Sequence, residues 1–143
     1  MEELKCEALG SYISQIHRKN NIFITKRLSK YGIGSGQYMF LLKLYNQDGI
    51  NQEALADSLF IDKGTTARAI KILEEEGIVY RVKDKNDKRA YEIYLTDKAK
   101  YIKDEVFNIL KEWESIITFN LTSEEKYEII KILKKISTNA NIR

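Results

Sequence analysis

The sequence contains no proline and only one cysteine, Cys6, in 143 residues. A single cysteine excludes an internal disulfide and is typical of a reducing compartment, so we expect a cytoplasmic protein. No run approaches the roughly 20 apolar residues that a membrane-spanning helix needs. The first residues include Glu2, Glu3 and Lys5 and no apolar run, so we expect neither a signal peptide nor a membrane partner.

Groups that carry chemistry are equally scarce. His17 is the only histidine, and neither Cys6 nor the carboxylates give a recognisable metal-ligand spacing with it. The sequence offers no Ser-His-Asp combination and no cofactor fingerprint. We therefore expect no enzyme, no bound metal and no cofactor, and we interpret His17 as a structural side chain, with an effector contact as the alternative.

A glycine-rich segment at residues 32–36 has the composition of a phosphate-binding loop. It joins two expected helices and does not follow a strand, so we interpret it as a flexible turn. The next helix carries Gln37 and Tyr38, and we expect Gly34 or Ser35 to open it.

Length and charge limit the remaining possibilities. The chain has no internal repeat or low-complexity linker, and 143 residues suffice for one domain with its own core. The net charge of +3 is modest for a nucleic-acid binder, so any attraction to nucleic acid must come from local clusters of cations.

The segment from Asn51 to Gly77 predicts two short helices. Asn51 and Gln52 open the first. Asp62 is a good N-cap for the second, because its carboxylate can accept hydrogen bonds from N–H groups of the first turn. Gly77 suits the left-handed position just after a helix end.

The second of these helices has two different faces. Steps of about 100° predict a buried face made of Thr66, Ala69, Ile70 and Leu73. The opposite face combines a small residue, a hydroxyl and cations, which suits base edges and phosphates. Gly64 also lets the helix approach DNA closely. The candidate DNA contacts are Lys63, Gly64, Thr65, Arg68 and Lys71.

Two strand-like runs follow, from Ile78 to Lys83 and from Ala90 to Leu95. Apolar and polar residues alternate in both, which is the period of a half-buried hairpin. The alternation places Tyr80 and Val82 on the apolar side of the first run, with Ile78.

The connector between these runs, residues 84–89, is strongly charged. From Ile78 to Ala90 there are five cations and two anions, a net of +3. Such a run is ordinarily a solvated turn, but beside a capped helix and a hairpin we interpret it as a DNA-binding tip. We expect Arg89 to enter a minor groove, with Asp87 holding its guanidinium and with Lys85 and Lys88 on phosphates.

Helix, turn, helix and ribbon together predict a winged helix-turn-helix, a mainly α fold with a small β-hairpin wing. In that fold one helix lies in a major groove of double-stranded DNA while the ribbon tip reaches an adjacent groove. Asn51 and Gln52, at the start of the first helix, can then contact the DNA backbone through N–H groups.

Three motifs resemble the MarR family of bacterial transcriptional regulators. They are DKGTTAR at 62–68, LEEEG at 73–77, and Asp87-Lys88-Arg89 followed six residues later by Leu95-Thr96. The resemblance includes Gln37-Tyr38 and two long C-terminal helices, so it covers nearly the whole chain. It implies a homodimer on pseudo-palindromic operators, with repression or activation that is often relieved by a small phenolic or lipophilic ligand or by thiol oxidation.

Apolar stripes near both ends of the chain predict the helices of the dimer. The first helix is expected from about Leu4 to Tyr31, and a capping box at 122–125 starts the last one. The stripes comprise Leu9, Ile13, Ile16, Ile24 and Leu28; then Ile102, Val106, Ile109, Leu110, Trp113, Ile116 and Ile117; then Ile129, Ile130, Leu133 and Ile136.

A winged helix of 46 residues (51–96) has little surface for all these stripes to cover. We therefore expect a symmetric homodimer of one domain per chain, with residues 1–31 and 97–143 as dimerisation helices around a lobe at 34–96. A sequence-specific regulator is the expected function, with repression favoured. A protein-interaction module that has lost DNA binding and a non-specific DNA-coating protein are the alternatives.

An effector is expected in the crevice between the dimerisation helices and the lobe, where it would change the spacing of the two DNA-reading helices. The candidate lining residues are Tyr12, Ile16, His17, Tyr38 and Leu42.

Cys6 is the one candidate for redox control. Some members of the MarR family sense peroxides through a thiolate near the start of the first helix, but that position falls near Gly10 here. Ile24 and Ser35 stand where the partner tyrosines would be, and only Lys5 is close enough in sequence to lower the pKa of the thiol. We expect Cys6 to be inert, with redox sensing as the alternative.

Overall fold

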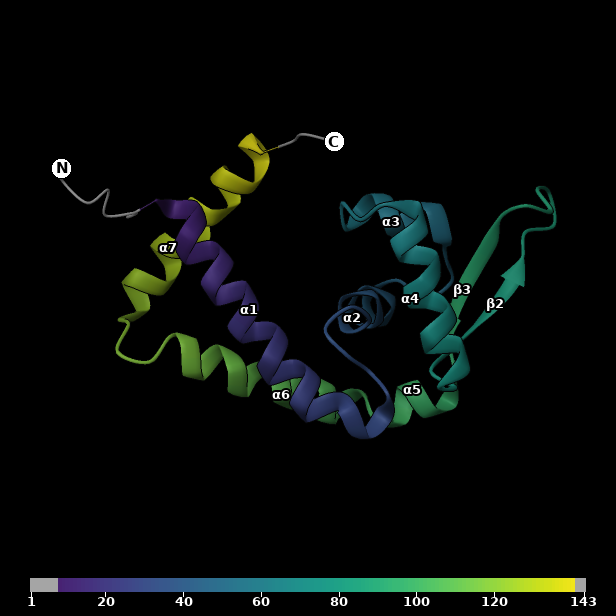
Figure 1. The fold of residues 1–143 in the computed structure, drawn as a ribbon, viewed down its shortest axis with the longest axis horizontal. Helices are drawn as coiled ribbons and strands as arrows, with labels where there is room; N and C mark the ends of the chain where they lie inside the picture. Colours follow the sequence, from purple (N-terminus) through teal and green to yellow (C-terminus); the bar gives the residue numbers. More distant parts are fainter. Residues whose placement is uncertain (1–7, 141–143) are drawn as a thin grey trace, which may run out of the picture.

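Helices dominate the computed structural model, which describes residues 8–140. Figure 1 places α3, α4 and the small sheet on one side, α7 and the start of α1 on the other, and α6 beneath. None of the described helices is long and apolar enough to cross a membrane. The elements are α1 (Leu9–Leu28), the 3₁₀ helix η1 (Ser29–Tyr31), α2 (Tyr38–Asn46), β1 (Ile50–Asn51), α3 (Gln52–Ser58), α4 (Lys63–Glu75), β2 (Val79–Lys83), β3 (Tyr91–Leu95), α5 (Asp97–Tyr101), α6 (Lys103–Ile117) and α7 (Ser123–Asn139).

The first helix begins at Leu9, later than the expected Leu4, and ends close to the expected position. It ends at Leu28, and η1 continues to Tyr31. The expected start at Leu4, and Cys6 with it, lies outside the described residues. The next helix begins at Tyr38, with Gln37 as its N-cap residue, which is later than expected. Residues 35–37 form a turn before it, and the Gly34 carbonyl accepts the N–H of Tyr38 at 3.1 Å.

The sheet has three antiparallel strands in the order β1-β3-β2. The expected ribbon of two strands was therefore one strand short. β1 has only two residues, Ile50 and Asn51, paired with Ile93 and Glu92. A strand of that length has no periodicity that a sequence could reveal, and it forms because the chain passes beside β3 on its way into α3.

The expected buried side of β2 was wrong as well. Val79 faces the core opposite Leu95, whereas the side chains of Tyr80 and Val82 are exposed. Tyr80 instead stacks on Tyr94 across the hairpin, with ring centroids 5.5 Å apart. Ile78 is buried but precedes the strand, so the alternation starts one residue later than the sequence pattern indicated.

One core joins the lobe to parts of α1 and α6. Phe40 and Leu44 of α2 are fully buried, as is Leu73 of α4. Ile24 and Leu28 from the end of α1 and Val106 and Ile109 from the start of α6 belong to the same cluster. The predicted inner face of α4 is confirmed, because Thr66, Ala69, Ile70 and Leu73 are all buried.

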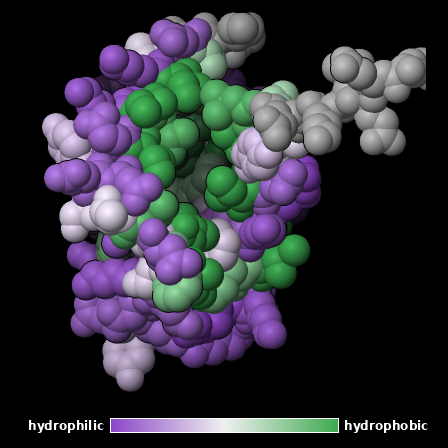
Figure 2. Space-filling model, turned by 90° about the vertical axis from the view of Figure 1, so that its left-hand side faces the viewer, coloured by the Kyte–Doolittle hydropathy of each residue, from purple (hydrophilic) through white to green (hydrophobic). Residues whose placement is uncertain are grey.

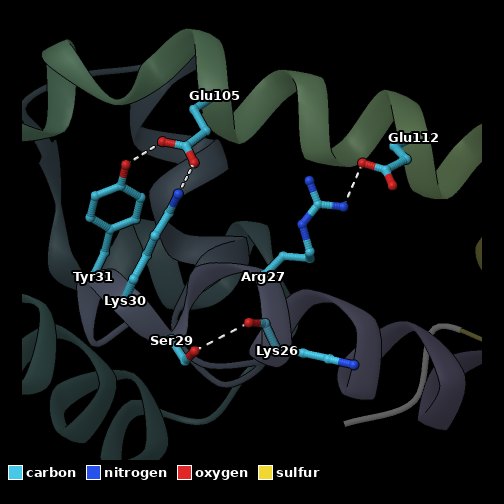
Figure 3. Close-up of polar contacts among 7 residues, drawn as sticks. All are labelled: Lys26, Arg27, Ser29, Lys30, Tyr31, Glu105 and Glu112. Carbon is cyan, nitrogen blue, oxygen red and sulfur yellow. Dashed lines mark hydrogen bonds and ion pairs between the residues drawn. The ribbon is translucent and has the colours of Figure 1, made fainter.

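Polar contacts fasten the end of α1 to α6 (Figure 3). Arg27 pairs with Glu112 at 2.5 Å, and Lys30 and Tyr31 both contact the carboxylate of Glu105. The hydrogen bond from Lys30, followed by that from Tyr31, holds the pKa of Glu105 below its usual value, and the same contact raises the pKa of Tyr31. These contacts lie at the edge of the shared core, where α1 packs against α6.

The outer parts of the same helices leave their apolar stripes uncovered. α7 begins with the predicted capping box at Thr122 and Glu125, yet none of its residues is buried. Ile16 of α1 and Ile116 of α6 are each 51% exposed. Figure 2 shows hydrophobic side chains of this region around a deep hollow, and a groove of about 840 Å³ lies between α1, α6 and α7.

Candidate nucleic-acid interface

The start of α4 is fixed by the residue that the sequence singled out. Asp62 accepts the backbone N–H and the hydroxyl of Thr65, both at 2.7 Å. These two hydrogen bonds lower the pKa of the Asp62 carboxyl, so it stays ionised at the positive end of the helix. Gly77 closes the helix region with a φ of +73°, as predicted.

The outward face of α4 presents the predicted polar set to solvent. Lys63, Gly64, Thr65, Arg68 and Lys71 are all exposed. The guanidinium of Arg68 donates to the hydroxyl of Thr65 at 3.2 Å, which continues the contact chain from Asp62. Arg68 is therefore held along the exposed face near the helix start. Its role in DNA contact stays a prediction.

Gly64 is not demanded by packing inside the chain. A Cβ atom built there would lie 3.5 Å from Nη1 of Arg68, which is ordinary van der Waals contact. Packing within the described residues therefore does not explain the glycine, and its close approach to a DNA backbone stays a prediction.

The start of α3 lies beside α4. Asn51 caps α3, because its Oδ1 accepts the N–H groups of Glu53 at 2.9 Å and Ala54 at 3.3 Å. Those two N–H groups are thus already satisfied, which weakens the expectation that this helix start offers several free N–H groups to a phosphate. Lys63 pairs with Glu53 across the two helices at 3.4 Å. Both side chains are mostly exposed, so this pair contributes little and can open for another anion.

Gln52 and Arg89, far apart in the sequence, line one hollow of about 250 Å³ with Lys63. Among the described residues, the buried Oε1 atom of Gln52 has no hydrogen-bond partner. The hollow therefore joins three parts of the predicted interface: the start of α3, the start of α4 and the base of the wing.

The wing tip is shaped by its acidic residues. Asp84 accepts the N–H of Asn86 at 2.8 Å, and Asp87 accepts the N–H of Arg89 at 3.0 Å. We expected Asp87 to hold the guanidinium of Arg89, whereas it holds the backbone, because a carboxylate two residues earlier fits an Asx turn. Lys85, Lys88 and Arg89 extend into solvent from this turn.

Sequence reasoning missed one polar contact between the wing and α4. Arg81 donates from both Nε and Nη2 to the carboxylate of Glu74, each at 3.2 Å. Its guanidinium also lies over the ring of Tyr91, 4.9 Å from the centroid. In the sequence, Arg81 stands out only as one of the five cations between Ile78 and Ala90. Glu74 and Arg81 are seven residues apart on either side of a helix end, and no local sequence pattern predicts a contact at that spacing.

The structure brings three of the five effector candidates together. A hollow of about 340 Å³ between α1, α2, α6 and α7 is lined by Ile13, Ile16, His17, Asn20, Tyr38, Trp113 and Leu133. Tyr12 and Leu42 lie outside that lining, since Tyr12 points into solvent and Leu42 packs against the lobe core. Asn20, which the sequence analysis missed, donates to the Tyr38 hydroxyl at 2.7 Å. Its place one turn after Ile16 was the available signal.

The chain is similar to known proteins in sequence and in fold. The MarR family model matches residues 33–91. A MarR transcriptional regulator from Methanosarcina mazei Go1 has a similar structure, with a TM-score of 0.87 and 44% identity over 92% of this chain and 94% of that one. The uncharacterized HTH-type transcriptional regulator YybA of Bacillus subtilis (strain 168) is 33% identical over 73% of this chain and 69% of its own length. Reduced AbfR bound to DNA is similar with a TM-score of 0.74 and 26% identity, over 91% of this chain and 90% of that chain.

Proposed function

The chain belongs to the MarR family of winged-helix, DNA-binding transcriptional regulators, and we propose that it is a homodimeric repressor of one pseudo-palindromic operator, released by a small-molecule effector. The observation that carries this proposal is the exposed face of α4, with Thr65, Arg68 and Lys71 beside a wing tip that carries Arg89. These are the two elements that a winged helix lays into adjacent grooves.

Each polar residue of this surface has a proposed task. Lys63, Thr65, Arg68 and Lys71 read or clamp the major groove, and Gly64 permits the close approach. Arg89 enters the minor groove and Asp87 shapes the turn that carries it. The remaining contacts are to the DNA backbone, from Lys85, Lys88, Asn51 and Gln52.

The proposed dimer is supported by the exposed stripes. The groove between α1, α6 and α7 has an apolar floor that includes Phe23, Trp113 and Ile130. Uncovered apolar surface of this size is unfavourable in water, and the same helices of a second copy would bury it in a symmetric interface. Residues 1–31 and 97–143 are then the dimerisation helices and 34–96 the DNA-binding lobe of a single domain. In this arrangement two copies of α4 face two half-sites about one turn of DNA apart.

The proposed effector site is the hollow that contains His17 and Tyr38. Ile16, Trp113 and Leu133 line both this hollow and the larger groove. A ligand seated there would contact dimerisation helices and the first residue of α2 in the lobe. Apolar walls with the Asn20 amide and the Tyr38 hydroxyl suit a small phenolic or lipophilic molecule. Binding would change the separation of the two copies of α4, and both half-sites could no longer be engaged at once.

The test is selection from random duplexes, followed by affinity measurements against scrambled DNA across a salt series. We expect an enriched inverted repeat, bound about 10³-fold or more above scrambled DNA. Salt-sensitive binding with no preferred sequence would identify a coating protein instead. No binding to any duplex would favour the protein-interaction module.

Ligand release is tested on the selected operator. We expect a phenolic compound that binds the hollow to weaken operator binding, and Tyr38→Ala to blunt that response while the affinity for DNA alone is kept. A compound that occupies the hollow without changing the operator affinity would contradict this part of the proposal.

A further inference from the structure

The outer part of the wing has little to hold it beside α4. Beyond Val79, which is buried, the side chains of β2 are exposed, and the outer face of the hairpin carries the solvent-facing stack of Tyr80 on Tyr94. Ile93 and Leu95 of β3 belong to the core, so the base of the hairpin is held, whereas residues 82–92 include no buried side chain and this outer part can pivot about the base. Whatever contacts its inner face therefore sets the angle between the wing and α4.

The described residues show one ion pair between the wing and α4, from Arg81 to Glu74. It is bidentate, with Nε and Nη2 on the two carboxylate oxygens at 3.2 Å. Both side chains are about one-third exposed, at 32% and 36%, so solvent screens this pair less than it screens the Lys63–Glu53 pair. A planar guanidinium in two parallel hydrogen bonds fixes direction as well as distance.

The same guanidinium also reaches the second strand of the wing. It lies over Tyr91, which follows Arg89 by two residues and lines the hollow that contains Arg89. Arg81 thus contacts α4 through Glu74 and contacts β3 just after the proposed minor-groove residue. A shift of Arg81 would move the base of the segment that carries Arg89.

We propose that Arg81 and Glu74 are positioning residues, which hold the wing at a fixed angle to α4 so that Arg68 and Arg89 reach adjacent grooves together. The proposal rests on the proposed function, because it assigns a task to residues that touch no DNA. The free energy that orders the wing is then supplied within the protein before DNA arrives, and binding loses less conformational entropy.

The proposal predicts an unusual direction for the change in DNA affinity when Glu74 loses its charge. Removing an anion from a DNA-binding lobe ordinarily strengthens binding, because it reduces repulsion of the phosphates. If Glu74 orients the wing through Arg81, Glu74→Gln weakens binding instead. Glu75→Gln is the matched control, since it removes the same charge from the next, exposed residue of α4. We expect Glu75→Gln to leave operator affinity unchanged or to raise it.

The experiment measures the operator affinity of the full-length protein for three single variants, Glu74→Gln, Arg81→Lys and Arg81→Gln. It also measures the double variant that combines Glu74→Gln with Arg81→Gln. We expect Glu74→Gln to weaken binding about fivefold. Arg81→Lys keeps the charge but loses the bidentate contact, so it should weaken binding as well. The double variant should bind no more weakly than Arg81→Gln, because each change breaks the same contact. Tighter binding by Glu74→Gln, or unchanged binding by Arg81→Lys, would overturn the proposal.

A second readout separates positioning from general stability. Hydroxyl-radical footprinting of the operator reports minor-groove protection by the wing, while methylation of guanine reports the major groove under α4. We expect Glu74→Gln to lose the minor-groove protection by the wing and to keep the major-groove protection under α4. Loss of both in parallel with a lowered melting temperature would mean a merely structural pair and would overturn the proposal.

Arg89→Ala distinguishes failure of this inference from failure of the proposed function. If Arg89→Ala removes minor-groove protection and Glu74→Gln does not, the wing binds DNA but is held by other contacts. If Arg89→Ala is silent, the wing is no DNA contact, and the proposed function loses that element together with the positioning role.

Discussion

The DNA-binding lobe buries its apolar residues within one chain, whereas the outer helices leave theirs exposed. In the lobe, α2 and α4 bury residues such as Phe40 and Leu73 completely. In α7, Leu133 and Ile130 remain 44% and 51% exposed, although their spacing is that of a buried helical face. The lobe completes its core within one chain, whereas the outer helices carry the pattern of a core without its other half.

The boundary between the two regions runs through the middle of helices. Ile24 of α1 is fully buried against the lobe, while Ile13, three turns earlier, is 42% exposed. In α6, Val106 is buried and Ile117 is exposed. A continuous helix transmits displacement along its length, so whatever covers the outer ends is rigidly linked to the lobe. This continuity is the physical basis for the proposed effect of an effector on α4.

The change with the largest expected effect is Leu133→Asp in α7. Leu133 lines both the outer groove and the small hollow. If a second chain covers it, a carboxylate there loses apolar burial twice in a symmetric dimer, about 3–6 kcal/mol in all. We expect a monomer by sedimentation at micromolar concentration and loss of operator binding.

Lys135→Asp is the control for Leu133→Asp. It makes a larger change of charge two residues away, on the other face of α7, and should leave the dimer intact. A Leu133→Asp protein that sediments and binds DNA like the wild type would show that α7 lies outside the interface.

Phe40→Ala addresses the other side of the comparison. Phe40 is fully buried in α2, so removing its ring lowers the free energy of unfolding by about 3–5 kcal/mol through lost burial and a cavity. The lobe core is internal to one chain, so this loss should not vary with protein concentration. Denaturant unfolding at two concentrations checks it, since a dimer-interface defect responds to concentration and a core defect does not. A loss that grows on dilution would mean that Phe40 also supports the interface.

Local signals in the sequence predicted much of the lobe. The Asp62 cap, the inner face of α4 and Gly77 at positive φ depend on neighbours within one or two helical turns, and the structure confirms them. The capping box at Thr122 belongs to the same class. Such features follow from the backbone's need for hydrogen bonds at helix ends, which a few consecutive residues satisfy.

Features that depend on tertiary contacts were not predictable in the same way. β1 exists only because β3 lies beside it, and the buried side of β2 is set by the pairing of Val79 with Leu95. The Arg81–Glu74 contact needs the angle at which the hairpin leaves α4. Among the effector candidates, helical spacing brought Ile16 and His17 to one place, but Trp113 joins them from α6, about a hundred residues away.

Asp62→Ala tests a local feature of the lobe, the N-cap of α4. The carboxylate of Asp62 caps α4 and also positions Thr65 through its hydroxyl. Losing an N-cap of this kind lowers stability by about 1 kcal/mol. Because the cap lies in the lobe, we expect the dimer to be unaffected while operator affinity falls with the disordering of the first turn. Asp62→Asn retains the capping oxygen, so it should keep most of the stability and most of the operator affinity. Equal losses in the two variants would mean that charge, not capping, is the property of Asp62 that matters.

The smallest expected effect concerns the junction of the two regions, at Glu105. The contacts from Lys30 and Tyr31 hold the pKa of Glu105 below the reference value of 4.5. A carboxyl whose pKa is lower in the folded state stabilises the fold above its unfolded pKa, and this contribution is lost as the pH falls through the folded pKa. Glu105→Gln should therefore have a lower melting temperature than the wild type at pH 7. We expect the difference to shrink below about pH 4.5.

Tyr31→Phe is an intermediate test of the same pH dependence. It removes one hydrogen bond to Glu105 and leaves the contact with Lys30. We expect its pH profile to lie between those of the wild type and Glu105→Gln. Melting curves from pH 7 down to about pH 3 provide the measurement, with each variant compared to the wild type at the same pH so that other carboxyls cancel. A Glu105→Gln difference that stays constant across this range would mean that the side chain fastens α6 to α1 by packing and not by its charge. The crossing of the two helices would then be set by the buried cluster around Ile24 and Val106 alone.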